Sequence, residues 1–182
     1  RHLPEFVLSD PWVTDNLTLR DLLSQRLELS PPDCTQVGDL KDQTQIVGFR
    51  ERYAPFPLAF AVLAEIVTRV SGEPFADFMR QELFDPLGFT RTIVSEDWPG
   101  DDADNRVMPH TTDGDTARPI DPPAWNVPAA DRGIFTCGVD CATWMRLNLR
   151  RGFLNRTPIV KWPSMVEIHA PHSIAEADER RG

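Results

Sequence analysis

The sequence predicts a mainly helical protein, one domain or part of one, with long irregular loops and few strands. Apolar residues recur at helical spacing in the interval 58–83, in two consecutive runs, and again in the interval 19–27. The interval from Ser95 to Pro128 is instead rich in Asp, Pro and Gly and sustains neither a helical nor an alternating pattern. With 182 residues, 41% of them apolar and 26% charged, the chain has the composition of an ordinary soluble globular protein.

Two stretches in the first quarter of the chain are expected to lack helix. Residues 1–17 should be extended, because Pro4 and Pro11 interrupt regular helix. Residues 33–48 are polar and without periodicity, which predicts a loop.

A first helix is predicted between these two stretches. Thr18 is a favourable N-cap residue, and Asp21, three positions later, completes a pair that resembles a capping box. The sequence Ser30-Pro31-Pro32 ends the helix. Its apolar stripe consists of Leu19, Leu22, Leu23 and Leu27.

Two amphipathic helices are predicted in succession in the centre of the chain. Gly72 separates them, and Pro74 suits the first turn of the second helix, where a missing N–H costs nothing. The sequence Asp85-Pro86-Leu87-Gly88 ends the second helix. The apolar face of the first helix consists of Leu58, Ala61, Val62, Ala64, Ile66 and Val70. The apolar face of the second consists of Phe75, Phe78, Met79 and Leu83.

The C-terminal third is expected to hold a short strand and two further helices. Ile134-Phe135-Thr136 predicts the strand, which leads to a helix that Asp140 caps and that runs through Leu149 before Gly152 closes it. A last helix is predicted over Ser164 to His169. The side chains of the middle helix that should face inward are Trp144 and Leu147.

The charge of the chain argues against polyanionic partners. The 19 Lys and Arg residues are outnumbered by 28 Asp and Glu residues, which makes a net charge of −9. The longest basic clusters are Arg150-Arg151 and Arg180-Arg181. The sequence therefore predicts no nucleic-acid partner and no membrane partner, while a protein partner remains possible. Residues 174–182 should form a charged, frayed end.

The sequence predicts no metal site and no cofactor. An acidic run in the long excursion lacks the residue order of a calcium-binding loop, so a solvated acidic loop is the favoured interpretation. His169 and His172 lie close together, but no Cys or carboxylate completes a recognisable ligand pattern. Cys137 and Cys141 could meet across one helical turn, although small buried thiols are favoured. The acidic run consists of Glu96, Asp97, Asp101, Asp102 and Asp104.

Several ordered pieces of the sequence resemble one family and together cover most of the chain. The central pieces are Phe49-x-x-Arg52, Arg69-Val70-Ser71-Gly72, Pro74-Phe75-x-x-Phe78 and Phe84-x-Pro86-Leu87-Gly88-Phe89-Thr90-x-Thr92. The flanking pieces are Leu3-Pro4-Glu5-Phe6, the run from Thr18 to Ser24, the segment from Asp140 to Leu147 and Glu167-Ile168-His169-Ala170-Pro171. These pieces resemble the serine β-lactamase-related family, which contains class C β-lactamases, D-alanyl-D-alanine carboxypeptidases similar to penicillin-binding proteins, and related esterases and acyltransferases.

The resemblance implies an α+β fold of the β-lactamase and transpeptidase type. Residues 1–182 would then be a single partial domain, mainly its helical subdomain. It would lack the N-terminal nucleophile segment and the C-terminal sheet segment. The long excursion would correspond to an irregular segment that closes over the active-site cleft.

The first catalytic motif of this family is S-x-x-K, in which a lysine one helical turn later activates a serine nucleophile. Residues 1–182 contain no S-x-x-K, because no serine is followed by a lysine at the third position. In the family this motif lies upstream of the part that matches Leu3-Pro4-Glu5-Phe6. The third motif, K-T-G or H-x-G, would follow residue 182.

The second catalytic motif is Y-x-N, whose tyrosine moves protons and whose asparagine holds the substrate amide or ester. Alignment from both sides without a gap puts this motif on Pro55-Phe56-Pro57, and proline side chains neither donate nor accept a proton. Tyr53, the single Tyr of the chain, lies two residues early and is the one candidate catalytic residue. A local bulge would have to move it by about 6–7 Å, and the alternative is an aromatic packing residue.

The sequence also departs from the family pattern in the loop after the first helix, and a different set of catalytic residues has to be considered. The family's H-x-S-G-L corresponds here to Gln25-Arg26-Leu27-Glu28-Leu29, with Glu28 at the glycine position. A β-carbon there strains a backbone with positive φ, so either the loop has changed shape or the helix runs on. A Ser-His-Asp set on other residues stays open, although no G-x-S-x-G sequence anchors one.

The sequence therefore predicts a member of the serine hydrolase and acyltransferase family that is catalytically inactive by itself. Completed by missing segments, it would act on small ester or amide substrates. The alternative is a non-catalytic pseudoenzyme that serves as an interaction or ligand-binding module. Neither hypothesis assigns an intact catalytic residue to this chain.

Overall fold

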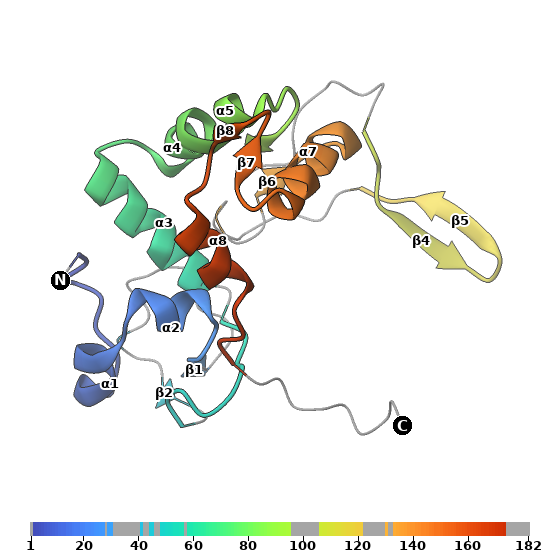
Figure 1. Ribbon diagram of the computed structural model, residues 1–182. Helices are drawn as coiled ribbons and strands as arrows, with labels where there is room; N and C mark the ends of the chain where they lie inside the picture. The colour runs from blue at the N-terminus through green and yellow to red at the C-terminus, as the bar shows by residue number, and fades with distance from the viewer. Residues whose placement is uncertain are drawn as a thin grey trace, which may run out of the picture.

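The computed structural model describes residues 2–27, 29–30, 41, 44–45, 48–56, 58–95, 106–121, 130 and 133–173. It has mixed helices and short strands, in keeping with the α+β class (Figure 1). The acidic run 96–104, most of the expected loop 33–48 and the charged end 174–182 lie outside the described residues, as do Glu28 and Pro57.

The helices and strands follow one another along the chain in a mixed order. The helices are α1 (Pro11–Asn16), α2 (Leu19–Leu23), α3 (Leu58–Ser71), α4 (Phe75–Met79), α5 (Asp85–Leu87), α7 (Gly138–Leu149) and α8 (Trp162–His169), with a π-helical turn at Arg80–Phe84. The strands form antiparallel pairs: β1 (Leu29–Ser30) with β2 (Thr44–Gln45), β3 (Ile93–Val94) with β6 (Ile134–Phe135), β4 (His110–Asp113) with β5 (Thr116–Pro119), and β7 (Phe153–Leu154) with β8 (Thr157–Pro158).

The prediction that residues 1–17 are extended is wrong, because α1 lies within them. Asp10 is the N-cap of α1, and its side chain accepts hydrogen bonds from the N–H groups of Trp12 and Val13. Pro11 occupies the first helical position, where its missing N–H leaves no hydrogen bond unmade. Pro11 therefore starts a helix instead of blocking one.

The predicted helix after Thr18 is confirmed at its start but is shorter than expected. Thr18 and Asp21 form the complete capping box of α2. The helix ends at Leu23, and Gln25 has a φ of +53°, so the helix does not run on through Leu27. Leu22 and Leu27 are buried, whereas Leu19 and Leu23 are exposed.

The first central helix is confirmed as α3, but its apolar face is buried only in its N-terminal half. Leu58, Ala61 and Val62 belong to the core, while Val70 is exposed. Gly72 follows the helix with a φ of +80°, which suits a residue without a β-carbon. In Figure 1, α3 runs from the region of α2 to the region of α4.

The second central helix differs from the prediction in its middle. A π-helical turn at Arg80–Phe84 separates α4 from α5. Its wider i→i+5 bonding rotates the residues that follow. Phe84 and Leu87 are buried, and Leu83 lies only partly buried. Gly88, with a φ of +68°, ends α5 as predicted.

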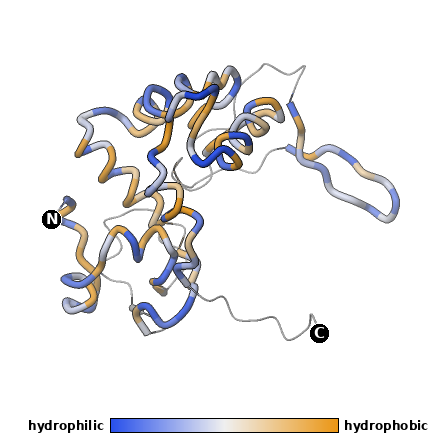
Figure 2. Tube along the Cα trace, viewed as in Figure 1, coloured by the Kyte–Doolittle hydropathy of each residue, from blue (hydrophilic) through white to orange (hydrophobic). Residues whose placement is uncertain are grey.

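The hairpin formed by β4 and β5 was not predicted within the excursion from Ser95 to Pro128. Asp113 pairs with Thr116, so Gly114 and Asp115 form a two-residue loop, and Gly114 has a φ of +60°. Positive φ at the first loop residue is typical of a tight type II′ turn. The hairpin projects from the rest of the described chain, and its mainly hydrophilic residues appear blue to white in Figure 2.

The predicted strand and helix at 134–149 are confirmed as β6 and α7, with two corrections. Cys137, not Asp140, is the N-cap residue of α7, and Asp140 lies buried in the first turn. Leu147 is fully buried as predicted, but Trp144 is 41% exposed. The thiols of Cys137 and Cys141 are free, and Cys141 is exposed instead of buried.

The last helix is confirmed as α8, two residues longer at its start than predicted. Pro163 lies in its first turn, and Met165 is buried. Gly152, before β7, has a φ of +91°, and a β-carbon there would lie 2.2 Å from the carbonyl oxygen of Val160. This close approach explains why the chain has glycine after α7.

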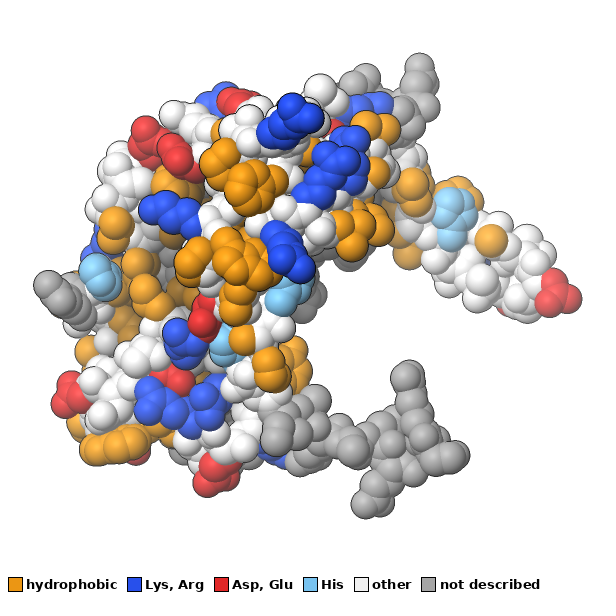
Figure 3. All heavy atoms as spheres, viewed as in Figure 1, with side chains coloured by type: hydrophobic (Ala, Val, Ile, Leu, Met, Phe, Trp, Pro, Cys, Tyr) orange, Lys and Arg blue, Asp and Glu red, His pale blue; other side chains and the backbone are white. Residues whose placement is uncertain are grey.

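One hydrophobic cluster holds the N-terminal segment, α2, the segment before α3 and α3 together. Large apolar side chains also remain on the surface, where Figure 3 shows them in orange. The longest described helix, α3, has 14 residues, and none of the described helices could cross a lipid bilayer. The buried members of the cluster are Leu3, Leu8, Val13, Leu22, Leu27, Phe56, Leu58, Ala59, Ala61 and Val62.

Candidate functional site

The candidate site is the segment just before α3, where the Y-x-N motif of the resembled family falls. Ala54 and Phe56 are buried, whereas Tyr53 is 44% exposed and Pro55 is exposed. Alternate side chains of an extended segment point to opposite sides. Tyr53 and Pro55 therefore share the outer face, and Phe56 contributes its ring to the core.

Gln25 holds this segment in place. Its carbonyl oxygen accepts a hydrogen bond from the N–H of Ala54 at 2.8 Å, and its Oε1 accepts one from the N–H of Phe56 at 2.5 Å. A parallel bridge between Arg26 and Ala54 continues the contact. The turn after α2 thus binds the N–H of Ala54 through a backbone carbonyl and the N–H of Phe56 through the buried side chain of Gln25.

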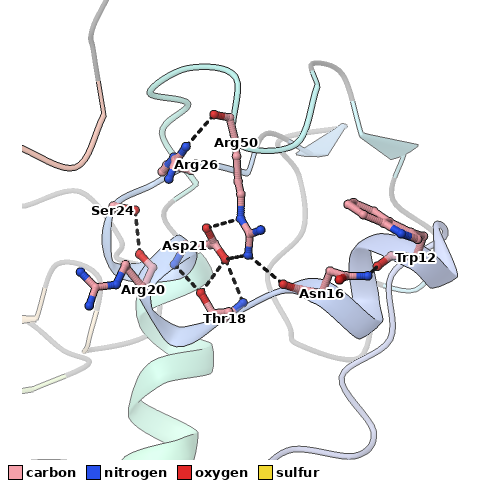
Figure 4. Close-up of polar contacts among 8 residues, drawn as sticks. All are labelled: Trp12, Asn16, Thr18, Arg20, Asp21, Ser24, Arg26 and Arg50. Atoms are coloured by element: carbon pink, nitrogen blue, oxygen red, sulfur yellow. Dashed lines mark hydrogen bonds and ion pairs between the residues drawn. The ribbon is translucent and has the colours of Figure 1, made fainter.

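A second anchor joins α2 to the chain just before the segment. Arg50 donates from Nε to Oδ1 of Asp21 at 2.8 Å and from Nη2 to Oδ2 of Asp21 at 2.6 Å (Figure 4). Thr18 also donates to Asp21, from its N–H at 3.0 Å and from its hydroxyl at 2.5 Å. The Nη2 group of Arg50 further donates to the carbonyl oxygen of Asn16 at 2.9 Å, and Arg26 donates to the carbonyl oxygen of Arg50 at 2.7 Å.

The electrostatics of this anchor favour the charged forms of both partners. Burial raises the pKa of Asp21, but the hydrogen bonds from Arg50 and Thr18 outweigh it, so the pKa lies below the ordinary aspartate value. The hydrogen bond to Asp21 in turn raises the pKa of Arg50. Asp21 is nearly fully buried and holds a bidentate guanidinium, so the pair fixes geometry and is not available as an acid or a base.

The residues predicted from the sequence are only partly brought together. Tyr53 lies on the same face as Pro55, which stands at the first position of the Y-x-N motif. Pro57, at the last position of that motif, lies outside the described residues. Sequence reasoning assigned Asp21 to a helix cap and did not find its contact with Arg50, which lies 29 residues away. Neither did it find Gln25, because no local pattern marks a side chain that binds a distant backbone N–H.

A pocket between α2 and α8 contains the residue types of a serine triad but not its geometry. The pocket has a volume of about 400 Å³ and is lined by Ser24, Glu167 and His172, among others. The hydroxyl of Ser24 donates to the carbonyl oxygen of Arg20 at 2.7 Å. His172 Nε2 lies 2.7 Å from the carbonyl oxygen of Glu167. The described contacts therefore contain no hydrogen bond between Ser24 and His172, and a triad would need one.

Two further histidines, His110 and His169, take part in hydrogen bonds. His110 Nδ1 lies 2.7 Å from the carbonyl oxygen of Met108, and His169 Nε2 lies 3.1 Å from Oδ1 of Asn148. Among the described residues, no group of three or more His, Cys, Asp or Glu side chains is arranged to hold a metal ion.

The sequence matches one family model and resembles part of a curated protein. Residues 1–162 match the family model described as Beta-lactamase. The unguisins hydrolase ungD′ of Aspergillus campestris is 30% identical in an alignment of length 105 that covers 50% of this chain and 20% of that protein.

Solved structures superpose on most of the chain. EstCE1, described as a hydrolase with promiscuous acyltransferase activity, superposes with a TM-score of 0.63 at 19% identity, over 91% of this chain and 54% of EstCE1. The octameric penicillin-binding protein homologue from Pyrococcus abyssi superposes with a TM-score of 0.58 at 18% identity, over 74% of this chain and 28% of that homologue. The chain thus spans about half the length of EstCE1 and a smaller share of the other two proteins.

Proposed function

This chain belongs to the Beta-lactamase family, and on that premise we propose that it forms the helical part of a serine hydrolase or acyltransferase domain for small ester or amide substrates. We further propose that residues 1–182 are catalytically inactive by themselves. The names of the two hydrolases above, one with acyltransferase activity, support the reaction class.

One observation carries the proposal of inactivity: the position of the family's proton-transferring motif holds no side chain that can move a proton. Pro55 has no donor or acceptor atom in its side chain, and Phe56 is buried in the core. The side chain of Gln25 accepts a hydrogen bond from the N–H of Phe56 and so stabilises the buried position of Phe56. Residues 1–182 also contain no S-x-x-K, the pattern that would supply an activated nucleophile.

The direct test is hydrolysis by the purified chain. We expect nitrocefin and p-nitrophenyl acetate to be hydrolysed no faster by the native chain than by heat-denatured chain. We also expect no fluorescent penicillin to remain bound after denaturing electrophoresis, because no acyl-enzyme forms.

Two variants make this test decisive if turnover is seen. Tyr53→Phe removes the single tyrosine hydroxyl and keeps the ring, and Ser24→Ala removes the hydroxyl that lines the pocket between α2 and α8. Turnover that either substitution abolishes would overturn the proposal and identify the catalytic group. Turnover that neither substitution alters, in protein from which contaminating esterase has been removed, would overturn it too.

A second candidate is a pseudoenzyme that serves as an interaction or ligand-binding module. The anchors that hold Pro55 and Phe56 favour this candidate, because they preserve the fold where the catalytic groups are replaced. This candidate requires a chain that folds cooperatively. A single sharp urea transition, seen alike by far-UV circular dichroism and tryptophan fluorescence, would support it, and a chain without any such transition would exclude it.

A further inference from the structure

One stretch of this acidic chain has the opposite charge. Residues 141–166 contain five cationic side chains and no Asp or Glu, although the whole chain carries a net charge of −9. The stretch covers most of α7, the β7–β8 hairpin and the start of α8. Its cations are Arg146, Arg150, Arg151, Arg156 and Lys161.

Part of this stretch forms a surface in which cations and aromatic rings are mixed. The guanidinium of Arg151 lies over the ring of Trp162, 5.0 Å from its centroid. Trp162 and Phe153 are both exposed by more than 40%. Figure 3 shows blue side chains beside orange ones over α7 and the β7–β8 hairpin. We call this the basic surface and define it as Arg150, Arg151, Phe153, Arg156, Lys161 and Trp162.

The cations of the basic surface have no acidic partners in the part of the chain that the structure describes. All four are exposed, and none takes part in an ion pair with a described residue. Arg50 and Arg80, by contrast, pair with Asp21 and Asp77. The cations of the basic surface are therefore available to a ligand.

Arg156 lies at the tip of the β7–β8 hairpin in a backbone conformation that is unfavourable for a residue with a side chain. Leu154 pairs with Thr157, so Asn155 and Arg156 form a two-residue loop, with φ values of +48° and +70°. Positive φ at both residues is typical of a type I′ turn, in which glycine is preferred at the second place. A side chain there is strained, and Arg156 makes no described contact that offsets the strain. The turn closes the β7–β8 hairpin and holds Arg156 at its tip, where the side chain is exposed.

We propose that the basic surface binds an acidic segment of a partner protein, one that carries apolar residues between its carboxylates. Guanidinium groups match carboxylates in a bidentate geometry, and exposed Trp and Phe rings offer apolar contact. Screening limits charge interactions to about 8 Å at physiological ionic strength, so a short segment senses mainly these cations. A nucleic acid or a membrane extends beyond the basic surface and meets the acidic remainder of the chain. This proposal does not depend on whether the protein hydrolyses a substrate.

The test measures the binding of a short fluorescein-labelled peptide of alternating Glu and Leu by fluorescence anisotropy. We expect saturable binding to the chain that weakens as salt is raised. The double variant R150E/R156E should bind the peptide roughly tenfold more weakly, because two attractive charges become repulsive. R118E, a charge reversal in the projecting β4–β5 hairpin, is the matched control and should bind as the unmodified chain does.

The proposal would be overturned if the chain showed no saturable binding of the Glu-Leu peptide, or bound a Lys-Leu peptide with equal affinity. It would also be overturned if R118E lost as much affinity for the Glu-Leu peptide as R150E/R156E does. Tighter binding of an oligothymidylate or of phosphatidylserine vesicles than of the Glu-Leu peptide would overturn it as well.

A second variant separates binding from folding. Arg156→Gly removes the cation and places the preferred residue at the strained position. The melting temperature should therefore stay unchanged or rise while the affinity for the Glu-Leu peptide falls. An affinity equal to that of the unmodified chain would contradict the role of Arg156 and overturn the proposal.

Discussion

Asp140 is the residue that ties the first turn of α7 to the segment after α5. Its carboxylate accepts hydrogen bonds from the N–H groups of Thr90 at 3.3 Å and Arg91 at 3.0 Å, and from the hydroxyl of Thr92 at 2.8 Å. Burial raises the pKa of Asp140, but these hydrogen bonds outweigh it and lower the pKa below the ordinary aspartate value. The contact orients the chain that enters β3, and it requires the ionised carboxylate.

Asp140→Asn should lower the free energy of unfolding at pH 7 by about 2 kcal/mol, because hydrogen bonds to a charged acceptor are lost. The stabilisation by Asp140 is fully present above the unfolded-state pKa, about 3.9, and is lost as pH falls toward the lower folded-state pKa. Urea unfolding between pH 7 and pH 3 should therefore show the two proteins converging in acid. Asp115→Asn, at the exposed tip of the β4–β5 hairpin, is the control and should leave the free energy of unfolding at pH 7 unchanged. If the free energies of unfolding of the Asp140→Asn variant and the unmodified chain differed by the same amount at every pH, the role given to the ionised carboxylate of Asp140 would be wrong.

At the scale of elements, α7 buries one side and exposes the other. Asp140, Thr143 and Leu147 are buried at intervals of three and four residues. Cys141, Met145 and Leu149 follow one another at intervals of four and are exposed. Two of the three buried residues are polar and the exposed row is apolar, so the hydrophobic pattern of α7 alone does not identify its buried side.

Leu147 and Leu149 offer a matched comparison on one helix. Leu147 is 0% exposed and Leu149 is 80% exposed. Leu147→Ala should lower the free energy of unfolding by about 2–5 kcal/mol through the cavity it leaves. Leu149→Ala should change it by less than about 0.5 kcal/mol. Urea unfolding followed by circular dichroism measures both, and equal losses would show that the assigned orientation of α7 is wrong.

At the scale of the whole molecule, apolar surface remains uncovered. The hydrophobic cluster around Leu27 and Val62 joins α2 to α3, but α7 and α8 keep large apolar side chains exposed. The chain spans about half the length of EstCE1. Exposed apolar patches of this kind favour association.

We expect the purified chain to self-associate reversibly as its concentration rises. The double variant Met145→Gln and Leu149→Gln should shift this association to higher concentration without loss of stability, because both side chains are exposed. Sedimentation velocity over a range of concentrations measures the effect. A chain that stays monomeric at every concentration would contradict the prediction, as would a double variant that associates like the unmodified chain.

The sequence predicted elements well where one local signal was enough. The capping box of Thr18 and Asp21 and the start and end of α3 are as expected. The strand β6 and the helix α7 lie where they were predicted, although Cys137 and not Asp140 is the N-cap residue of α7. The helix α1 was missed because Pro11 was interpreted as a helix breaker, although a proline at the first position leaves no hydrogen bond unmade. The β4–β5 hairpin was missed although Gly114-Asp115 is a sequence typical of a two-residue turn.

At the candidate site, too, the sequence predicted which residues occupy the motif position, but not their burial or their distant contacts. Register alone put Pro55-Phe56-Pro57 on the motif position and Tyr53 two residues before it. The burial of Phe56 and the exposure of Tyr53 required the structure. Gln25 and Phe56 are 31 residues apart, and a contact over that distance leaves no periodic signal in the sequence.

The sequence by itself determined the family, the helical character of the centre and the absence of S-x-x-K from these residues, because each depends on residue identity and short-range spacing. Only the tertiary structure decided which face of each helix is buried, where a π-helical turn shifts that face, and which distant side chains hold the segment before α3. It also brought Arg151 onto Trp162 and left the basic surface without acidic partners among the described residues. Burial and pairing depend on which surfaces meet after folding, and that is a property of the packed chain.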